Sequence, residues 1–157
     1  MESIKIPFFS SNLGRIDFVA QVMTADRKTF FDVDFKLDSG SDFTTLSCND
    51  LYKLGYTRDF LRQCPYHKHP VTTASNTIHL QYLENISIKF EEREIQGCRI
   101  FFATETSMRS LFGSDILKYF NWSVNYDEGL FQMTKTTRTP QLSKEEQPLH
   151  IYDVGVI

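Results

Sequence analysis

The stretch 30–41 constrains the fold of this 157-residue chain more than any other part of its sequence. Apolar and polar residues alternate over 30–37, which is typical of a β-strand with one buried face. The residues predicted to share that buried face are Phe31, Val33, Phe35 and Leu37. The pattern stops at an acid, so the strand is expected to end there.

A carboxylate therefore stands at the turn that follows this strand. Asp38 is followed by Ser39, Gly40 and Ser41, and glycine permits backbone conformations that other residues resist. Backbone N–H groups and hydroxyls in such a turn can hold a carboxylate in one orientation. The turn marks Asp38 as a candidate catalytic acid.

The composition excludes several classes of function. The formal net charge is -3, so there is no electrostatic case for binding nucleic acid. No apolar run approaches the roughly 20 residues that span a bilayer, and no secretory signal is visible at the start of the sequence. The 3 cysteines are odd in number and irregularly spaced, which favours free thiols in a reducing compartment. We expect a cytoplasmic protein that does not contact a membrane.

The rest of the chain is mainly extended, as its 14 phenylalanines and 7 tyrosines favour. One short helix is expected after Ser47, because a hydroxyl residue followed three positions later by Asp50 is a helix-start signal. Leu51 and Leu54 would face inward, and Gly55 would end this helix. A second helical turn is expected over 57–64, and a third, from Ser114, would be capped by that serine. The strands are predicted at 4–8, 16–22, 30–37, 71–74, 77–80, 86–90, 98–102, 122–126 and 130–133.

Composition changes near the C-terminus. Residues 134–148 are polar and contain two prolines, as linkers do, whereas residues 149–157 are apolar again. The sequence therefore predicts a domain over 1–133, a polar linker over 134–148, and a C-terminal segment over 149–157 that docks or forms a dimer-interface strand.

Two blocks of sequence give the chain its resemblance to a known family. The first is Phe-Lys-Leu-Asp-Ser-Gly-Ser at 35–41, and the second is Leu-Phe-Gly-Ser-Asp-Ile-Leu at 111–117. Their order, with a hairpin before, a short helix and hairpin between, and a strand pair at 122–133 after them, resembles the retropepsins, the single-domain aspartic proteases. The resemblance covers about residues 14–133.

The resemblance implies an all-β fold: a closed β-barrel with one or two short helices, completed as a homodimer. It implies an aspartic endopeptidase in which Asp38 of each copy would share a proton and a water. Ser39 would brace the two loops, Gly40 would direct an N–H toward the carboxylates, and the Ser41 hydroxyl would bond the outer carboxylate oxygen. Gly113 would let an apolar strand pass close behind this loop. The implied partners are a second copy and a peptide or protein substrate.

The hairpin tip resembles the flap that closes over a bound peptide in this family. Viral flaps are rich in glycine, whereas no glycine lies between Tyr56 and Glu94. The residues implied in substrate binding are Thr73, Ala74, Ser75, Asn76, Thr77 and Ile78.

These residues also admit other interpretations. The chain could be a catalytically silent retropepsin-like module that only binds or dimerises, which the glycine-poor flap favours. Asp115 is interpreted as a helix-start acid, and Cys48 and Cys98 as core residues. The histidines His67, His69, His79 and His150 lack the spacing of a metal site. No metal and no cofactor is expected.

Overall fold

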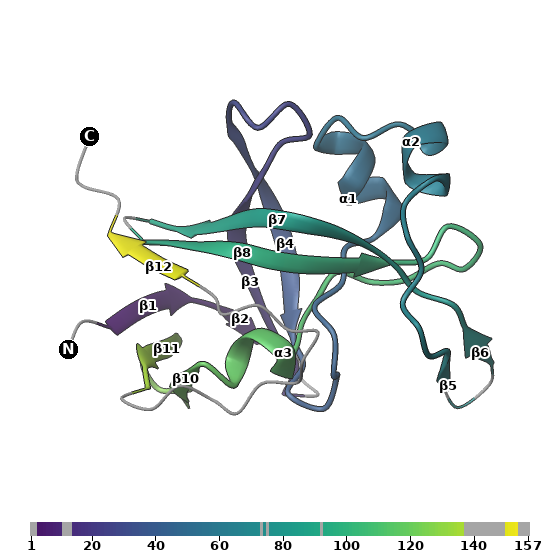
Figure 1. Ribbon diagram of the computed structural model, residues 1–157. Coiled ribbons are helices and arrows are strands. Elements are labelled where there is room, and N and C mark those ends of the chain that lie inside the picture. The colour runs from purple at the N-terminus through teal and green to yellow at the C-terminus, as the bar shows by residue number, and fades with distance from the viewer. Residues whose placement is uncertain are drawn as a thin grey trace.

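Strands form most of the ordered structure (Figure 1). The computed structural model describes residues 3–10, 14–72, 74, 76–91, 93–136 and 150–153. The strands are β1 (Ser3–Pro7), β2 (Phe9–Ser10), β3 (Ile16–Met23), β4 (Phe30–Leu37), β5 (Val71–Thr72), β6 (Thr77–Ile78), β7 (Gln81–Phe90), β8 (Arg93–Phe102), β9 (Leu111–Phe112), β10 (Phe120–Asn125), β11 (Leu130–Lys135) and β12 (His150–Asp153). The helices are α1 (Cys48–Lys53), α2 (Arg58–Arg62) and α3 (Ser114–Leu117).

Three sheets organise these strands. The largest has 7 strands in the order β12-β8-β7-β3-β4-β9, with β2 paired to β3. In Figure 1 the long β7–β8 hairpin crosses the β3–β4 hairpin, so this sheet curls around the core. A second sheet has the order β1-β11-β10, and β5 and β6 form a separate hairpin. The architecture confirms the predicted all-β fold with short helices; its closure by a second copy stays a prediction.

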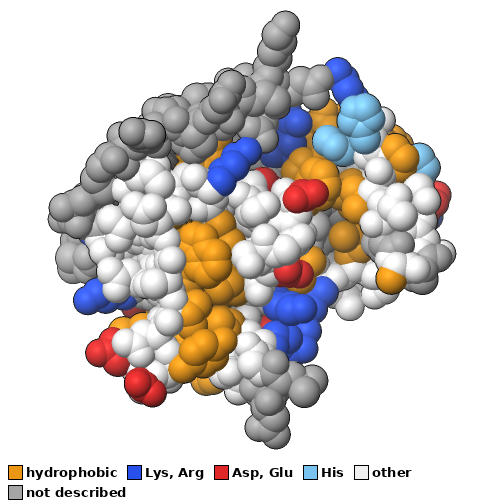
Figure 2. Space-filling model, turned by 90° about the horizontal axis from the view of Figure 1, so that it is seen from below, with side chains coloured by type: hydrophobic (Ala, Val, Ile, Leu, Met, Phe, Trp, Pro, Cys, Tyr) orange, Lys and Arg blue, Asp and Glu red, His pale blue; other side chains and the backbone are white. Residues whose placement is uncertain are grey.

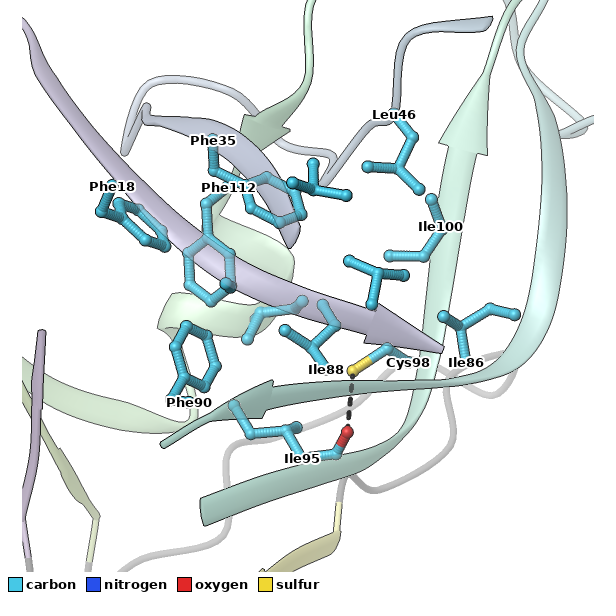
Figure 3. Close-up of a cluster of buried hydrophobic side chains, with 14 of the residues drawn as sticks. Phe18, Phe35, Leu46, Ile86, Ile88, Phe90, Ile95, Cys98, Ile100 and Phe112 are labelled. Atoms are coloured by element: carbon cyan, nitrogen blue, oxygen red, sulfur yellow. Dashed lines mark hydrogen bonds between the residues drawn. The ribbon is translucent and has the colours of Figure 1, made fainter. Parts of the chain in front are cut away.

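Phenylalanine rings fill the space between the β3–β4 hairpin and the strands that cover it. Phe18 of β3 lies 5.9 Å from Phe35 of β4, 5.4 Å from Phe112 of β9 and 5.7 Å from Phe131 of β11, between ring centroids. Figure 3 shows Phe18, Phe35, Phe90 and Phe112 facing one another, with isoleucines of β7 and β8 beside them. This packing fixes the direction of β4, and thus of the residues that follow it.

The predicted alternation in β4 is only partly right. Val33 and Phe35 are buried opposite Ala20 and Phe18 of β3, as expected. Phe31 lies on the same face but is 50% exposed. It is the second residue of β4, near the turn between β3 and β4, although Val22, its partner on β3, is 0% exposed.

The short helices follow local signals. The Ser47 hydroxyl accepts a hydrogen bond from the Asp50 N–H at 3.1 Å, Leu51 and Leu54 are buried, and Gly55 ends α1 with a φ of +98°. These features confirm the predicted first helix. The prediction for α3 was wrong in one respect: its N-cap is Gly113, which has no side chain to accept a bond, and not Ser114.

The C-terminal boundaries can be compared with the sequence only in part. Strand β11 continues through Lys135, two residues into the predicted linker, and residues 137–149 lie outside the described residues. Strand β12 pairs antiparallel with β8 at the edge of the large sheet, with Ile151 opposite Ile95. Among the helices of the described residues, none is long and apolar enough to cross a membrane.

Replacing Phe18 with alanine should destabilise the fold strongly. Phe18 is 1% exposed and contacts four other rings, so its loss leaves a cavity and should lower the free energy of unfolding by about 3–5 kcal/mol. Phe31→Ala, in the same hairpin, is the matched control and should cost about 1 kcal/mol or less. Urea denaturation of both variants measures this effect. Equal losses in the free energy of unfolding would mean that the aromatic cluster around Phe18 does not stabilise the core.

Candidate active site

Asp38 lies directly after β4, where the chain begins to loop around β9. The Asp38 N–H donates to the Phe112 carbonyl at 3.0 Å, and Leu37 pairs in parallel with Phe112. On the other side of β9, Thr45 exchanges two backbone hydrogen bonds with Leu111, at 2.9 and 3.1 Å. Strand β9 therefore lies between β4 and Thr45, and the loop 38–45 connects its two sides.

The loop and β9 come closest at Gly113. A Cβ atom on this residue would lie 2.5 Å from the Phe43 carbonyl oxygen and 2.9 Å from that of Ser41. The next residue, Ser114, donates its N–H to the same Ser41 oxygen at 2.8 Å. Only a residue without a side chain fits this approach, and the sequence had placed Gly113 behind the loop.

The turn itself differs from expectation at two residues. The Gly40 N–H donates to Asp38 Oδ1 at 3.2 Å, but the φ of Gly40 is not positive, so no special backbone conformation requires glycine there. The Ser41 hydroxyl donates to the Phe43 carbonyl at 2.8 Å, in place of the expected bond to Asp38. In this turn the Ser41 side chain thus stabilises the loop and not the carboxylate. Ser39 is exposed.

A second acid lies behind the loop. Asp115, in the first turn of α3, accepts hydrogen bonds from the Thr44 N–H at 3.0 Å and the Thr44 hydroxyl at 2.6 Å. Burial raises the pKa of Asp115, and the bonds from Thr44 and Ile116 and the charge of Lys118 lower it to a smaller extent. The sequence identified Asp115 as a helix-start acid but gave no signal for its contact with Thr44, 71 positions away.

The predicted flap and the Asp38 loop contact the same apolar cluster. Val71 of β5 and Ile78 of β6 pack on buried Leu80, Phe101 and Ala103, together with Phe43 of the loop. The Phe43 ring lies 4.6 Å from Phe101 and 5.1 Å from His67. Figure 2 shows the histidines beside hydrophobic side chains at this end of the molecule. Ala74, Asn76 and Thr77 are exposed at the hairpin tip, while Thr73 and Ser75 lie outside the described residues.

The remaining candidates form no second site. The described residues contain no group of three side chains able to hold a metal ion. Burial raises the pKa of both Cys48 and Cys98, which disfavours the nucleophilic thiolate. Cys98 is a core residue as expected, whereas Cys48 is only partly buried.

The chain is similar in structure to a retropepsin-like aspartic protease from Rickettsia conorii. The two share 19% sequence identity with a TM-score of 0.56, and the match covers 84% of this chain and 89% of that one. No protein-family model and no curated protein matches the chain. The chain therefore has a retropepsin-like fold, as the two sequence blocks had indicated.

Gly113→Ala should destabilise the protein, because its Cβ would overlap the loop backbone. We expect a loss of about 1–3 kcal/mol in the free energy of unfolding. Gly40→Ala is the control: its Cβ would meet only Asp38 Oδ1, at 3.5 Å, so its effect should stay within about 1 kcal/mol. Denaturant titration measures both, and a tolerated Gly113→Ala would contradict the close approach.

The free energy of unfolding should depend on pH through Asp115. Its pKa in the folded protein lies above the ordinary value of 3.8, so between those two values the folded state binds more protons than the unfolded state. The contribution of this residue to stability is therefore largest at low pH and falls as the pH rises through the folded pKa. Urea titrations of the wild type and Asp115→Asn at successive pH values test this. If the free energy of unfolding of the wild type, minus that of Asp115→Asn, rose with pH, the prediction would be wrong.

Proposed function

We propose that this protein is an aspartic endopeptidase that acts as a homodimer, with one Asp38 contributed by each copy. The observation that carries the proposal is the geometry at Asp38. This acid follows β4, a strand with one partly buried face, and its backbone is bonded to β9. Its carboxylate accepts the Gly40 N–H, and its loop packs on Gly113. The retropepsin-like fold supports the same assignment.

The proposed chemistry needs two carboxylates. Two such groups close together cannot both ionise readily, so one keeps its proton. The ionised carboxylate takes a proton from water as that water attacks the peptide carbonyl, and the protonated one donates to the carbonyl oxygen. Because the sequence holds one Asp-Ser-Gly, a twofold axis beside Asp38 would supply the second carboxylate.

The end of the molecule that carries the turn after β4 also carries apolar surface that such an interface could use. Figure 2 views the end of the molecule where Figure 1 places β10, α3 and the turn after β4, and a band of hydrophobic side chains crosses it. Trp122 of β10 is 41% exposed, and Tyr126, just after β10, is 59% exposed. Apolar surface of this kind favours association with a second protein surface.

The apolar cluster between the loop and the β5–β6 hairpin suggests the class of substrate. Phe43 and Ile78 come from the two elements that would lie on either side of a bound peptide. We infer that the enzyme prefers peptides with large apolar side chains near the scissile bond, bound along the hairpin by main-chain hydrogen bonds.

Asp38→Asn should lower the rate of peptide cleavage by about 1000-fold or more and leave the dimer intact, because the amide cannot act as the base. Cleavage of a peptide library between about pH 4 and 8, with size-exclusion chromatography, measures both properties. Asp34→Asn, at an exposed position of β4, is the control and should remain active.

Three results would overturn the proposal. Cleavage by Asp38→Asn at the wild-type rate would exclude this acid as the base. A monomeric Asp38→Asn variant would make the acid structural. A wild type that neither cleaves peptides nor binds a statine-type transition-state mimic would favour a binding or dimerisation module.

A further inference from the structure

Besides its backbone hydrogen bonds, the far end of the Asp38 loop is held by one side-chain pair. Thr44 is fully buried, and both its N–H and its hydroxyl donate to the Asp115 carboxylate, to Oδ2 and Oδ1 respectively. The same hydroxyl oxygen accepts the Gly113 N–H at 3.0 Å. The loop, the helix α3 and the glycine behind the loop therefore meet at Thr44.

A carboxylate is a costly choice for this position, because burial disfavours its charged form. Its hydrogen bonds among the described residues come from neutral donors: Thr44 twice, and the Ile116 N–H at 3.0 Å. The titratable groups whose charges interact with the Asp115 carboxylate are Cys98 of β8 and Lys118 at the end of α3. Neither group donates a hydrogen bond to this carboxylate. The Asp115 carboxylate supplies two accepting oxygens, one for the Thr44 N–H and one for the Thr44 hydroxyl.

We propose that Asp115 is a positioning residue for the proteolysis proposed above: by holding Thr44 it fixes the loop that carries Asp38. This inference rests on the proposed function, since positioning has a kinetic meaning only if Asp38 reacts. Two catalytic carboxylates must lie within hydrogen-bond distance of a shared water, and a displacement of about 1 Å can reduce a rate about 100-fold.

The proposal also predicts a pH effect on the loop. A protonated carboxyl can accept fewer hydrogen bonds than the carboxylate, because its own O–H becomes a donor. The added proton faces the Thr44 donors, so the contact to the protonated oxygen should weaken. Protonation of Asp115 should therefore add to the acid-side fall in activity that the catalytic pair causes, and this added part should be absent where Asp115 has been replaced.

Thr44→Val and Thr44→Ser separate positioning from packing. Valine keeps the shape of threonine but removes the hydroxyl, which leaves the Gly113 N–H without its acceptor; serine keeps the hydroxyl. We expect kcat to fall about tenfold or more in Thr44→Val with KM changed less than about threefold, and Thr44→Ser to stay within about twofold of wild type.

Asp115→Asn is the second variant, because an amide offers one accepting oxygen where Thr44 presents donors to two. It should lower kcat as Thr44→Val does and remove only the part of the acid-side fall that comes from Asp115, leaving the part that comes from the catalytic pair. Unchanged kcat in Thr44→Val and Asp115→Asn, with only the melting temperature lowered, would show that the pair is merely structural and would overturn the proposal.

A wild type without activity would refute the proposed function and not the loop geometry, so hydrogen exchange gives an independent test. The Gly113 and Asp38 amides should be protected in the wild type and in Thr44→Ser, and exchange at least tenfold faster in Thr44→Val. Equal protection in all three proteins would show that Thr44 does not hold the loop, whatever the activity.

Discussion

The candidate site depends on the close passage of the Asp38 loop over Gly113. Strand β9 is held on one side by β4 and on the other by Thr45, so the loop between these two elements must cross the end of β9. The carbonyls of Ser41 and Phe43 then lie where a Cβ atom of residue 113 would be. This contact joins two segments about 70 residues apart in the sequence, so a displacement of one should displace the other.

Two kinds of interaction share the task of placing Asp38. The aromatic packing around Phe18 and Phe112 is non-directional and sets where β4 ends. The polar contacts of Thr44 and Asp38 with α3 and β9 are directional, and they set how the chain turns after β4. A change in the core should therefore alter stability first, whereas a change in the polar contacts should alter the orientation of the carboxylate first.

The sequence predicted what depends on neighbours along the chain. The alternation in β4 and the Ser47 cap of α1 act within a few residues, so their patterns are visible in the sequence. The resemblance to the retropepsins implied that the chain passes close behind the loop at Gly113, and the backbone does so there. The bonds from Thr44 to Asp115 and from Ser110 to Asp50 link distant segments and leave no local pattern. The hydrogen bond of the Ser41 hydroxyl was mispredicted. The path of the loop decides whether this hydroxyl donates to the Asp38 carboxylate or to the Phe43 carbonyl, and the sequence does not show that path.

The two acids of the candidate site differ in burial, and burial alone would favour a different catalytic residue from the one proposed. Asp115 is the more buried acid and has the raised pKa, which by itself would favour it as the reactive group. The two carboxylate oxygens of Asp115, however, already accept three hydrogen bonds from Thr44 and Ile116. Neither oxygen is therefore directed toward a substrate. Asp38 is only partly buried, and within the described part of the chain its carboxylate accepts a hydrogen bond from Gly40 alone. That carboxylate has the free accepting capacity that general-base chemistry needs, and only a second carboxylate beside it would give the pair the shared proton that the chemistry also needs.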